Sequence, residues 1–336
     1  MRIGIAGAGL LGRLLAWRLA RDGHEVTVFD PAAGPQRGER CAAAFSAAGM
    51  LSPVAEMECG DAGLAALGWR SLELWPRWLD QLEEPVHFAR RGSLLLAHAG
   101  DRGSAERLLA RIAQQVPQHR PRAVEGDALR LLEPALAPGL HGWHLEGEGQ
   151  IQPLQALQAL AIVGTRLGVR WQWGCSVHEV AAGRLDGHRF DHAIDVRGVG
   201  ARDALPVRGV RGEVFWLHAP GVPLLHPLRL LHPRHRVYLV PRPGDLVVVG
   251  ASEIESEDRS PVSLRSTLEL LSAAHSMLPE LAEARIVHSE SNLRPALPDN
   301  LPRLVSEPGL TRLNGLFRHG WLVAPALVEQ AMKEMR

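Results

Sequence analysis

The pattern of apolar and polar positions in the first thirty residues predicts a strand, a helix and a second strand. Residues 2–6 form a short apolar run, which is typical of a buried strand. Residues 10–21 carry leucines and a tryptophan at helical spacing, and the Asp-Gly pair at 22–23 ends that pattern. Residues 25–29 alternate as a second strand that ends at Asp30.

The rest of the chain interleaves the two patterns. Helices are predicted at residues 62–82, 103–116, 127–132 (with Asp127 as the N-cap), 153–167 and 261–277. Strands are predicted at residues 86–97, 169–179, 193–196, 211–217, 236–240 and 245–250. Because helices and strands follow one another without segregation, we expect a mixed α/β fold.

Three glycines separate the first strand from the first helix, in the sequence G-A-G-L-L-G. Gly7 permits a tight turn, Gly9 lets the backbone approach a pyrophosphate, and Gly12 lets the helix and the strand pack closely. Leu10 and Leu11 open the helix, whose positive end favours phosphate groups. This strand–turn–helix–strand context is the one that the dinucleotide-binding fingerprint requires.

Asp30 follows Gly12 by 18 residues and stands at the end of the second strand. A carboxylate at that place can accept hydrogen bonds from an adenosine ribose and disfavours a 2′-phosphate. NADP therefore fits less well than FAD or NAD. The fingerprint alone leaves FAD and NAD open, and a glycine-rich turn in another α/β fold is the remaining alternative.

Composition narrows the classes of function. Lys plus Arg and Asp plus Glu both number 37, and this balance argues against general electrostatic binding to nucleic acid or to an anionic membrane. No run approaches the roughly 20 apolar residues of a membrane span, and no signal-peptide pattern is present, so we expect a cytoplasmic protein. Cys41, Cys59 and Cys175 lack the spacing of a metal site or a disulfide framework, and we expect no metal and buried thiols.

Seven segments along the chain carry a resemblance to a known family. The first is S-A-A-G-M-L-S-P at 46–53, where small residues let the backbone pass close to a flat ring. The others are Q-I-Q-P (150–153), R-G-E-V (211–214), Y-L-V-P-R (238–242), V-G-A-S-E (249–253), L-R-P-A-L-P-D (293–299) and F-R-H-G-W-L-V-A-P (317–325). In this order they resemble the FAD-dependent glycine oxidase and D-amino-acid oxidase family.

The resemblance implies FAD as cofactor and a particular architecture. A Rossmann-like FAD-binding domain (1–85, 145–205 and 286–336) would be interleaved with a mainly antiparallel-sheet substrate-binding domain (86–144 and 206–285). Some related sarcosine oxidases tether the flavin through a cysteine near the C-terminal end. No cysteine follows Cys175 in this chain, so we expect noncovalent FAD.

The resemblance also implies the substrate-binding residues. Arg294 is the first candidate for the substrate carboxylate, because a guanidinium can hold a carboxylate through two parallel hydrogen bonds. Tyr238, the only tyrosine in the chain, would contact the same carboxylate or close the site. Arg318 would border the site, and Met50 would lie against the ring or the substrate. A surface arginine, a core tyrosine and a core methionine are the corresponding alternatives.

Further residues are implied as FAD contacts, including backbone amides at the start of the helix after Arg318, which can stabilise negative charge on the flavin. The full set is Gly7, Gly9, Leu10, Leu11, Gly12, Asp30, Ser46, Ala47, Ala48, Gly49, Met50, Val177, Gly198, Arg294, Arg318, His319, Gly320, Trp321 and Leu322.

The chain departs from the family at two places. Leu316 and His319 replace the His and the Asn of the usual G-H-[FY]-R-N-G pattern, and for His319 a proton-transfer role and a structural role are both open. Asp195-Val196-Arg197-Gly198 replaces an apolar-Thr-Gly turn.

We therefore predict the oxidative deamination of glycine, another small amine or a D-amino acid, with oxygen as electron acceptor and hydrogen peroxide as product. One alternative is an amino-acid dehydrogenase that passes electrons to a quinone or a partner subunit. Others are an NAD-dependent dehydrogenase and a flavin-bearing subunit without activity of its own. A homo-oligomer is compatible with the sequence.

Overall fold

The strand–helix–strand pattern at the start of the chain is confirmed in the computed structural model, which describes residues 1–38, 41–58, 60–232 and 236–335. β1 (Arg2–Ala6), α1 (Leu10–Arg21) and β2 (Glu25–Asp30) follow one another, and the two strands pair in parallel. Residues 10–17 of the helix are all buried, because α1 is covered by the sheet and by helices from later parts of the chain.

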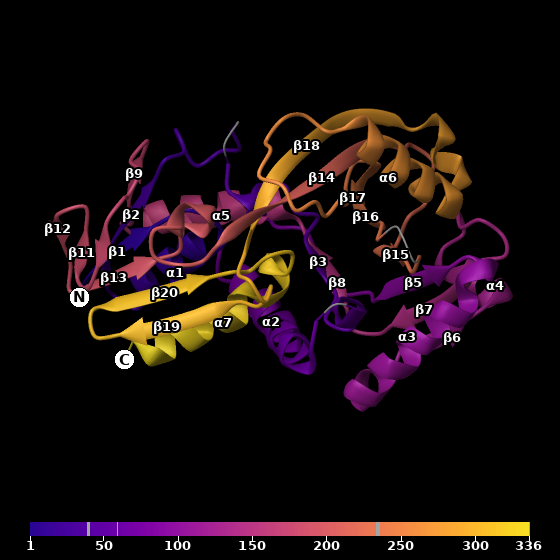
Figure 1. Cartoon of the computed structure of the whole chain (residues 1–336), viewed down its shortest axis with the longest axis horizontal. Helices are drawn as coiled ribbons and strands as arrows, with labels where there is room; N and C mark the ends of the chain where they lie inside the picture. The colour runs from indigo at the N-terminus through magenta and orange to yellow at the C-terminus, as the bar shows by residue number, and fades with distance from the viewer. Residues whose placement is uncertain (39–40, 59, 233–235, 336) are drawn as a thin grey trace.

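Strands from distant parts of the chain extend β1 and β2 into a six-stranded sheet (Figure 1). All neighbours are parallel except the last pair along the chain, β19 and β20, which are antiparallel. In spatial order the strands are β19 (Arg303–Glu307), β20 (Leu310–Asn314), β13 (His192–Asp195), β1, β2 and β9 (Arg170–Trp173).

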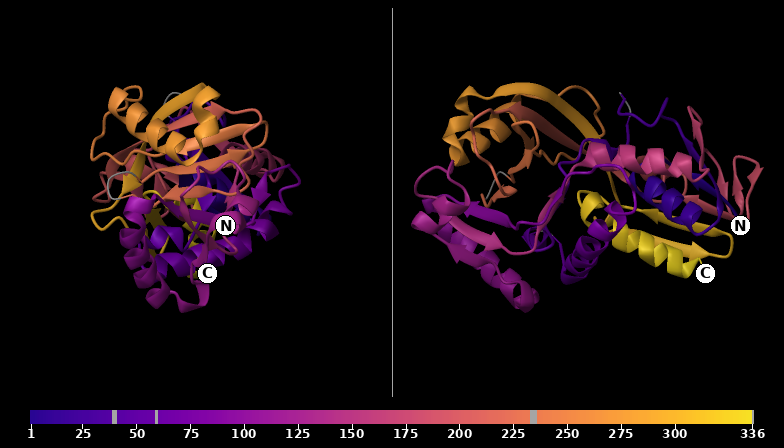
Figure 2. Two further views of the ribbon diagram at one scale, coloured as in Figure 1. Left: turned by 90° about the vertical axis from the view of Figure 1, so that its right-hand side faces the viewer. Right: turned by 180° about the vertical axis from the view of Figure 1, so that it is seen from behind.

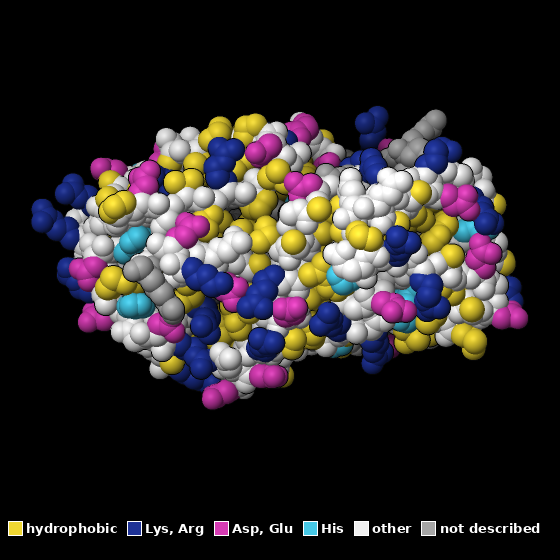
Figure 3. All heavy atoms as spheres, turned by 90° about the horizontal axis from the view of Figure 1, so that it is seen from below, with side chains coloured by type: hydrophobic (Ala, Val, Ile, Leu, Met, Phe, Trp, Pro, Cys, Tyr) yellow, Lys and Arg dark blue, Asp and Glu magenta, His cyan; other side chains and the backbone are white. Residues whose placement is uncertain are grey.

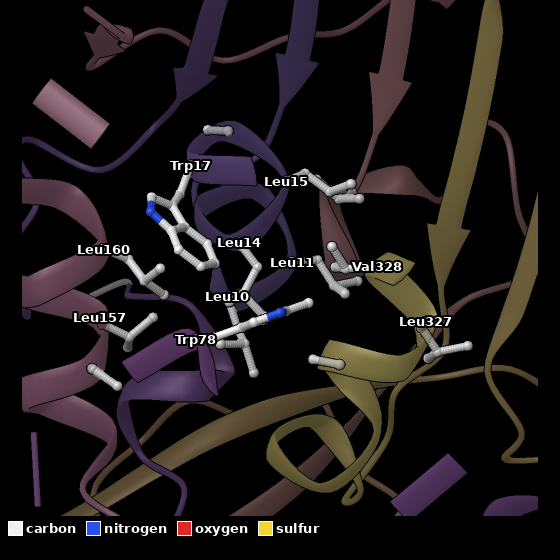
Figure 4. Packing of buried hydrophobic residues seen from close by; sticks show 14 of the residues in the cluster. Leu10, Leu11, Leu14, Leu15, Trp17, Trp78, Leu157, Leu160, Leu327 and Val328 are labelled. Atoms are coloured by element: carbon white, nitrogen blue, oxygen red, sulfur yellow. The ribbon is translucent and has the colours of Figure 1, made fainter. Parts of the chain in front are cut away.

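One core joins this sheet to four helices, α1, α2 (Ala62–Leu79), α5 (Pro153–Arg166) and α7 (Gly320–Glu334). Figure 4 shows leucines of α1 in the same core as Trp78 from α2, Leu157 and Leu160 from α5, and Leu327 and Val328 from α7. A second cluster packs the sheet against a small three-stranded sheet of β10 (Val180–Ala181), β11 (Arg184–Leu185) and β12 (His188–Arg189).

The second lobe is built on an eight-stranded, mainly antiparallel sheet, at the right of Figure 1 and the left of the rear view in Figure 2. Only β15 and β5 pair in parallel within it. In spatial order the strands are β18 (Arg285–Ala296), β14 (Arg208–His218), β17 (Leu246–Gly250), β16 (Tyr238–Arg242), β15 (Leu228–Leu230), β5 (Ser93–Ala97), β7 (His141–Leu145) and β6 (Arg122–Val124).

Three helices pack on this lobe. α6 (Leu264–Met277) and α4 (Gly126–Leu132) join one apolar cluster, and α3 (Arg102–Gln115) joins another. A small sheet of β3 (Met50–Leu51), β8 (Gly149–Ile151) and β4 (Phe88–Ala89) lies where the lobes meet. Short 3₁₀ helices complete the chain: η1 (Ala43–Phe45), η2 (Ala55–Glu58), η3 (Ala99–Asp101), η4 (Pro117–His119), η5 (Gly198–Ala201) and η6 (Pro279–Glu283).

The mixed α/β fold predicted from the sequence is confirmed, and several local predictions need correction. Asp127 is not the N-cap of α4, because the helix starts at Gly126 and Glu125 precedes it. Only Arg170–Trp173 of the predicted strand 169–179 is extended, since Gly174 adopts a positive φ that turns the chain away. α6 begins at Leu264 rather than at residue 261, because the Ser263 side chain caps it by accepting from the Ser266 amide.

Two cysteines lie in surroundings that differ from the prediction. Cys175 is exposed and Cys41 is half-buried, so neither is the fully buried small side chain that we expected, and Cys59 lies outside the described residues. Cys175 lies in the loop that follows β9, and Cys41 packs at the edge of the core around α1.

The two large sheets support the discontinuous division into two domains, which we propose with one change. The prediction places residues 286–296 in the FAD-binding domain. In the structure, β18 pairs along its length with β14 of the eight-stranded sheet. We therefore propose that the last FAD-binding segment starts after Ala296.

The surface shows no single dominant charge. In Figure 3 basic and acidic side chains are interspersed over the visible face, in line with the equal numbers of the two kinds in the sequence. Within the described residues, no helix combines the length and the apolar character that crossing a bilayer requires.

Candidate functional site

A cavity of about 1330 Å³ connects the two lobes. Its walls come from the turn between β1 and α1, the end of β2, the segment 41–50, the start of α7, and strands β14, β16 and β18. Every residue predicted from the sequence to bind substrate or cofactor lines this cavity, except Gly12.

At one end of the cavity lies the glycine-rich turn, in which each of the three glycines has a different structural role. Gly7 has a φ of +105°, which disfavours any side chain, and a Cβ on Gly12 would overlap the carbonyl oxygen of Gly7. Gly9 has a φ of −70°, and a Cβ there would meet only the Ala42 methyl group at 3.3 Å. The fold therefore needs Gly7 and Gly12, whereas Gly9 keeps the cavity open.

The start of α1 is suited to a phosphate group. Its N-cap, Gly9, has no side chain to accept from the first amides, and the first turn contains no acidic residue. Leu10 and Leu11 line the cavity at this place. Uncapped amides and the positive end of a helix dipole together attract an anion, so the turn fits a pyrophosphate.

Alanine substitutions at the two glycines separate these roles. Gly9→Ala is expected to leave the melting temperature of the apoprotein nearly unchanged and to lower FAD affinity by at least about tenfold, since the added methyl group occupies the space of the pyrophosphate. Gly12→Ala is expected to destabilise the apoprotein as well, because α1 must move away from β1. Thermal melts of apoprotein and FAD titration measure both. Equal melting temperatures for the two variants would contradict this assignment.

Asp30 lies on the cavity wall, where its carboxylate also organises the turn. One oxygen accepts from the Ala8 amide at 2.6 Å and the other accepts from the Ala32 amide at 2.8 Å. Each carboxylate oxygen has a further lone pair, so a ribose contact at Asp30 stays a prediction.

Val177 and Gly198 lie at the same end of the cavity and are held by residues that depart from the family pattern. Arg197 donates to the Val177 carbonyl oxygen at 2.9 Å and holds the buried Asp195 carboxylate through Nε and Nη2, both at 2.9 Å. Gly198 has a φ of +58°, and its carbonyl oxygen accepts from Asn314. The Asp195–Arg197 pair thus fixes the loop that contains Val177.

The segment Ser46–Met50 crosses the middle of the cavity, and three of the sequence motifs meet there. Gly49 has a φ of +67°, and a Cβ on it would overlap the carbonyl oxygen of Ile151. Arg242 donates to the carbonyl oxygen of Ala48 and, at 2.6 Å, to Oε1 of Gln150. Arg242 is buried, and this burial lowers its pKa to about 9. Arg242 thus joins the segments S-A-A-G, Q-I-Q-P and Y-L-V-P-R.

A second uncapped helix start faces the cavity. α7 begins at Gly320 between the two lobes, its N-cap His319 makes no side-chain capping bond, and its first turn has no acidic residue. The side chains of Trp321 and Leu322 are buried in the core, so their backbone is the part that can meet a ligand. This end is suited to a partial negative charge on a flavin ring.

Arg294 and Tyr238 come from strands β18 and β16 of the eight-stranded sheet and lie over glycines of the strands between them. A Cβ on Gly212 would overlap the Arg294 guanidinium, and a Cβ on Gly250 would lie 2.5 Å from the Tyr238 hydroxyl. Arg294 Nη1 donates to the Ser252 carbonyl oxygen at 2.9 Å. Among the residues that the structure describes, no carboxylate lies within ion-pair distance of this guanidinium.

The electrostatics at these two side chains suit a bound carboxylate. Burial lowers the pKa of Arg294, and Tyr238 partly offsets that effect. Burial raises the pKa of Tyr238, against the attraction of Arg294, so the phenol keeps its proton and can donate a hydrogen bond. A bound substrate carboxylate would supply the negatively charged partner that the Arg294 guanidinium lacks among the described residues.

Sequence reasoning missed an ionic cluster beside this pair. Glu56 on η2 accepts from Arg229 Nη2 at 2.6 Å, and its other oxygen lies 3.1 Å from Arg318 Nε and 3.0 Å from His319 Nδ1. Arg318 also donates to Glu253 at 3.0 Å. The one signal in the sequence was Arg229 between two leucines of an apolar run, because a buried arginine requires a partner.

The carboxyl of Glu56 stays ionised in this cluster. Burial by itself raises its pKa, but Arg229, Arg318 and His319 together hold the pKa well below its usual range. Within the described part of the chain, no group of three or more His, Cys, Asp or Glu side chains is arranged to hold a metal ion.

Comparison with known proteins identifies the family. A profile of the FAD dependent oxidoreductase family matches residues 2–331, which is nearly the whole chain. The chain belongs to the FAD-dependent oxidoreductase family. FAD is therefore its cofactor, and the resemblance inferred from the ordered motifs is confirmed. The fit agrees with the two uncapped helix starts and the space kept open by Gly9.

Relatives that match nearly the whole chain are named as oxidoreductases or oxidases. The chain is 36% identical over 337 residues, 100% of this chain and 96% of the relative, to a Rhizobium etli protein named "Putative thiamine biosynthesis oxidoreductase ThiO". The structure of glycine oxidase from Geobacillus kaustophilus matches with a TM-score of 0.86 and 25% identity, over 99% of this chain and 94% of that one. The structure of iminodiacetate oxidase from Chelativorans sp. BNC1 matches with a TM-score of 0.83 and 25% identity, over 99% of this chain and 95% of that one.

Proposed function

We propose that this family member oxidises glycine or another small amine or D-amino acid with a free carboxylate to the keto acid and ammonia, with oxygen as electron acceptor. The observation that supports the proposal is the Arg294 guanidinium, which lines the cavity of the cofactor without a carboxylate partner among the described residues. The name of one structural relative, glycine oxidase, agrees with a small amino acid.

In this proposal Arg294 holds the substrate carboxylate through two parallel hydrogen bonds, and the Tyr238 hydroxyl donates a third. These contacts fix the carboxylate end, so the Cα–H bond can point toward the cofactor while Met50 limits the space beside it. The chemistry that bound FAD would supply here is that of a hydride acceptor for oxidation at Cα. The glycine-rich turn, Asp30, the segment Ser46–Met50 and the start of α7 are the residues that would hold it.

The alternatives make different predictions for one experiment, in which purified protein is examined by visible spectroscopy and screened with amines and D-amino acids. The proposal predicts a flavin spectrum, bleaching by a small amino acid and stoichiometric hydrogen peroxide. Turnover with an artificial dye but little peroxide would favour a dehydrogenase. A flavin that no amine reduces would favour a partner subunit without activity. Cytoplasmic location and homo-oligomer formation stay predictions.

The cofactor is expected to be released in full when the protein is precipitated with acid. Cys41 lies on the cavity wall. Burial raises the pKa of its thiol, the nearby Glu290 carboxylate raises it further, and the nucleophilic thiolate is therefore disfavoured. No cysteine follows residue 175. The absorbance of supernatant and pellet measures the release. Yellow colour that remains with the pellet would show a covalent link.

A further inference from the structure

His319 is a departure from the family pattern, and the structure places it beside an ionised carboxylate on the cavity wall. Its Nδ1 atom lies 3.0 Å from Oε2 of Glu56, and only 4% of the residue is exposed. Neither Nδ1 nor Oε2 makes a well-aligned hydrogen bond within the described residues, so this close approach is the main polar contact of the buried ring nitrogen.

This contact determines which ring nitrogen carries the proton. An ionised carboxylate would repel a ring lone pair at 3.0 Å, so this contact favours the tautomer that carries its proton on Nδ1. Nε2 then keeps its lone pair. Across the described residues Nε2 makes no hydrogen bond and is not enclosed as a buried atom without a partner, so it is open to the cavity that His319 lines.

The other charged groups around the imidazole explain why a base is placed here. Glu56 on η2 is already held by Arg229 of β15 and by Arg318, the neighbour of His319 in the chain. Glu253, Arg294 of β18 and Tyr238 of β16 lie on the same cavity wall. The guanidinium groups of Arg229, Arg318 and Arg294 have no lone pair that could accept a proton, Glu253 is paired with Arg318, and Tyr238 keeps its proton. Among these groups, Nε2 of His319 is therefore the available acceptor.

We propose that His319 Nε2 accepts the proton of the substrate ammonium group before hydride transfer. The inference rests on the proposed function, because it assigns a step to the same amino-acid substrate. One N–H bond of the ammonium breaks, its electron pair stays on the amine nitrogen, and the Nε2 lone pair forms the new N–H bond. The imidazolium returns this proton to solvent after the imino acid leaves. Glu56 positions the ring and stabilises its charged form.

The test compares wild type with His319→Asn, which offers a polar side chain of similar reach but no basic nitrogen. At pH 7 the variant is expected to show kcat/KM about 100-fold lower than wild type, the usual contribution of a general base. The loss should disappear above the pKa of the amine itself, where solvent supplies neutral amine. A ratio that stays constant across pH, or an unchanged kcat/KM, would overturn the proposal. The exposed His275→Asn on α6 is the control for loss of a histidine.

A second measurement does not depend on turnover. Spectra of protein labelled with ¹⁵N-histidine report the tautomer of each ring, and the resonance missing from His319→Asn (or, if that variant loses its fold, from His319→Gln) assigns the signal. Protonated Nδ1 and unprotonated Nε2 are expected. A proton on Nε2 would overturn the assignment even if the enzyme is active. Conversely, if wild type oxidises no amine but the expected tautomer is found, the proposed function fails while the placement of His319 stands.

Discussion

Replacing Arg294 with alanine is expected to lower kcat/KM for an amino acid by a factor of roughly 30 to several thousand. That range corresponds to about 2–5 kcal/mol, the cost of removing one partner from a desolvated charge pair. The guanidinium lies over Gly212, is held by the Ser252 carbonyl oxygen and has no carboxylate partner among the described residues, so its charge is available to the substrate. Steady-state kinetics on protein with equal FAD content measures the loss.

Two comparisons isolate the carboxylate contact. An amine without a carboxylate should be oxidised equally poorly by wild type and by Arg294→Ala, because neither can hold it. Arg294→Lys should recover only part of the activity, since an ammonium group binds as a point charge and not through a planar pair of donors. Arg285→Ala, at the exposed start of the same strand β18, is the matched control. Unchanged kinetics for Arg294→Ala would remove this residue from the site.

The second large effect is expected on stability, at the buried pair that replaces the family's apolar-Thr-Gly turn. The Asp195 carboxylate is fully buried, and the Arg197 side chain that binds it through two nitrogens is 8% exposed. Removing Arg197 leaves the buried Asp195 carboxylate uncompensated, so Arg197→Met is expected to lower the free energy of unfolding by about 3–5 kcal/mol. Arg197 also pairs with Asp203 at 3.0 Å, so Asp195→Leu is expected to cost less. Urea unfolding of the apoprotein measures the loss of stability.

The double variant is the informative comparison. When both charges are replaced by apolar side chains of similar volume, no unpaired buried charge remains, so the double variant should be more stable than Arg197→Met. Both single variants and the double variant should also bind FAD more weakly, because Arg197 holds the Val177 carbonyl oxygen at the cavity wall. The exposed pair Arg2–Asp191 is the control, and Arg2→Met should change stability far less. Additive losses in the double variant would contradict this account.

Local sequence pattern was enough to determine the start of the fold. The apolar runs and the Asp-Gly stop placed β1, α1 and β2 within one residue of their observed bounds, because strand alternation and helical spacing are local properties. The steric reasons for Gly7 and Gly12 could also be predicted, since a tight turn into a helix needs them. Arg294 and Tyr238 were found through the ordered motifs, not through periodicity.

What the sequence could not show are contacts between residues far apart in the chain. Glu56 meets Arg229 and His319 only because η2, β15 and the start of α7 converge at the cavity, and no local pattern marks a carboxylate for that role. The assignment of β18 to the eight-stranded sheet likewise follows from its pairing with β14. Sequence periodicity fixes which face of an element is apolar, whereas the partner that covers that face is selected by packing and charge in the folded chain.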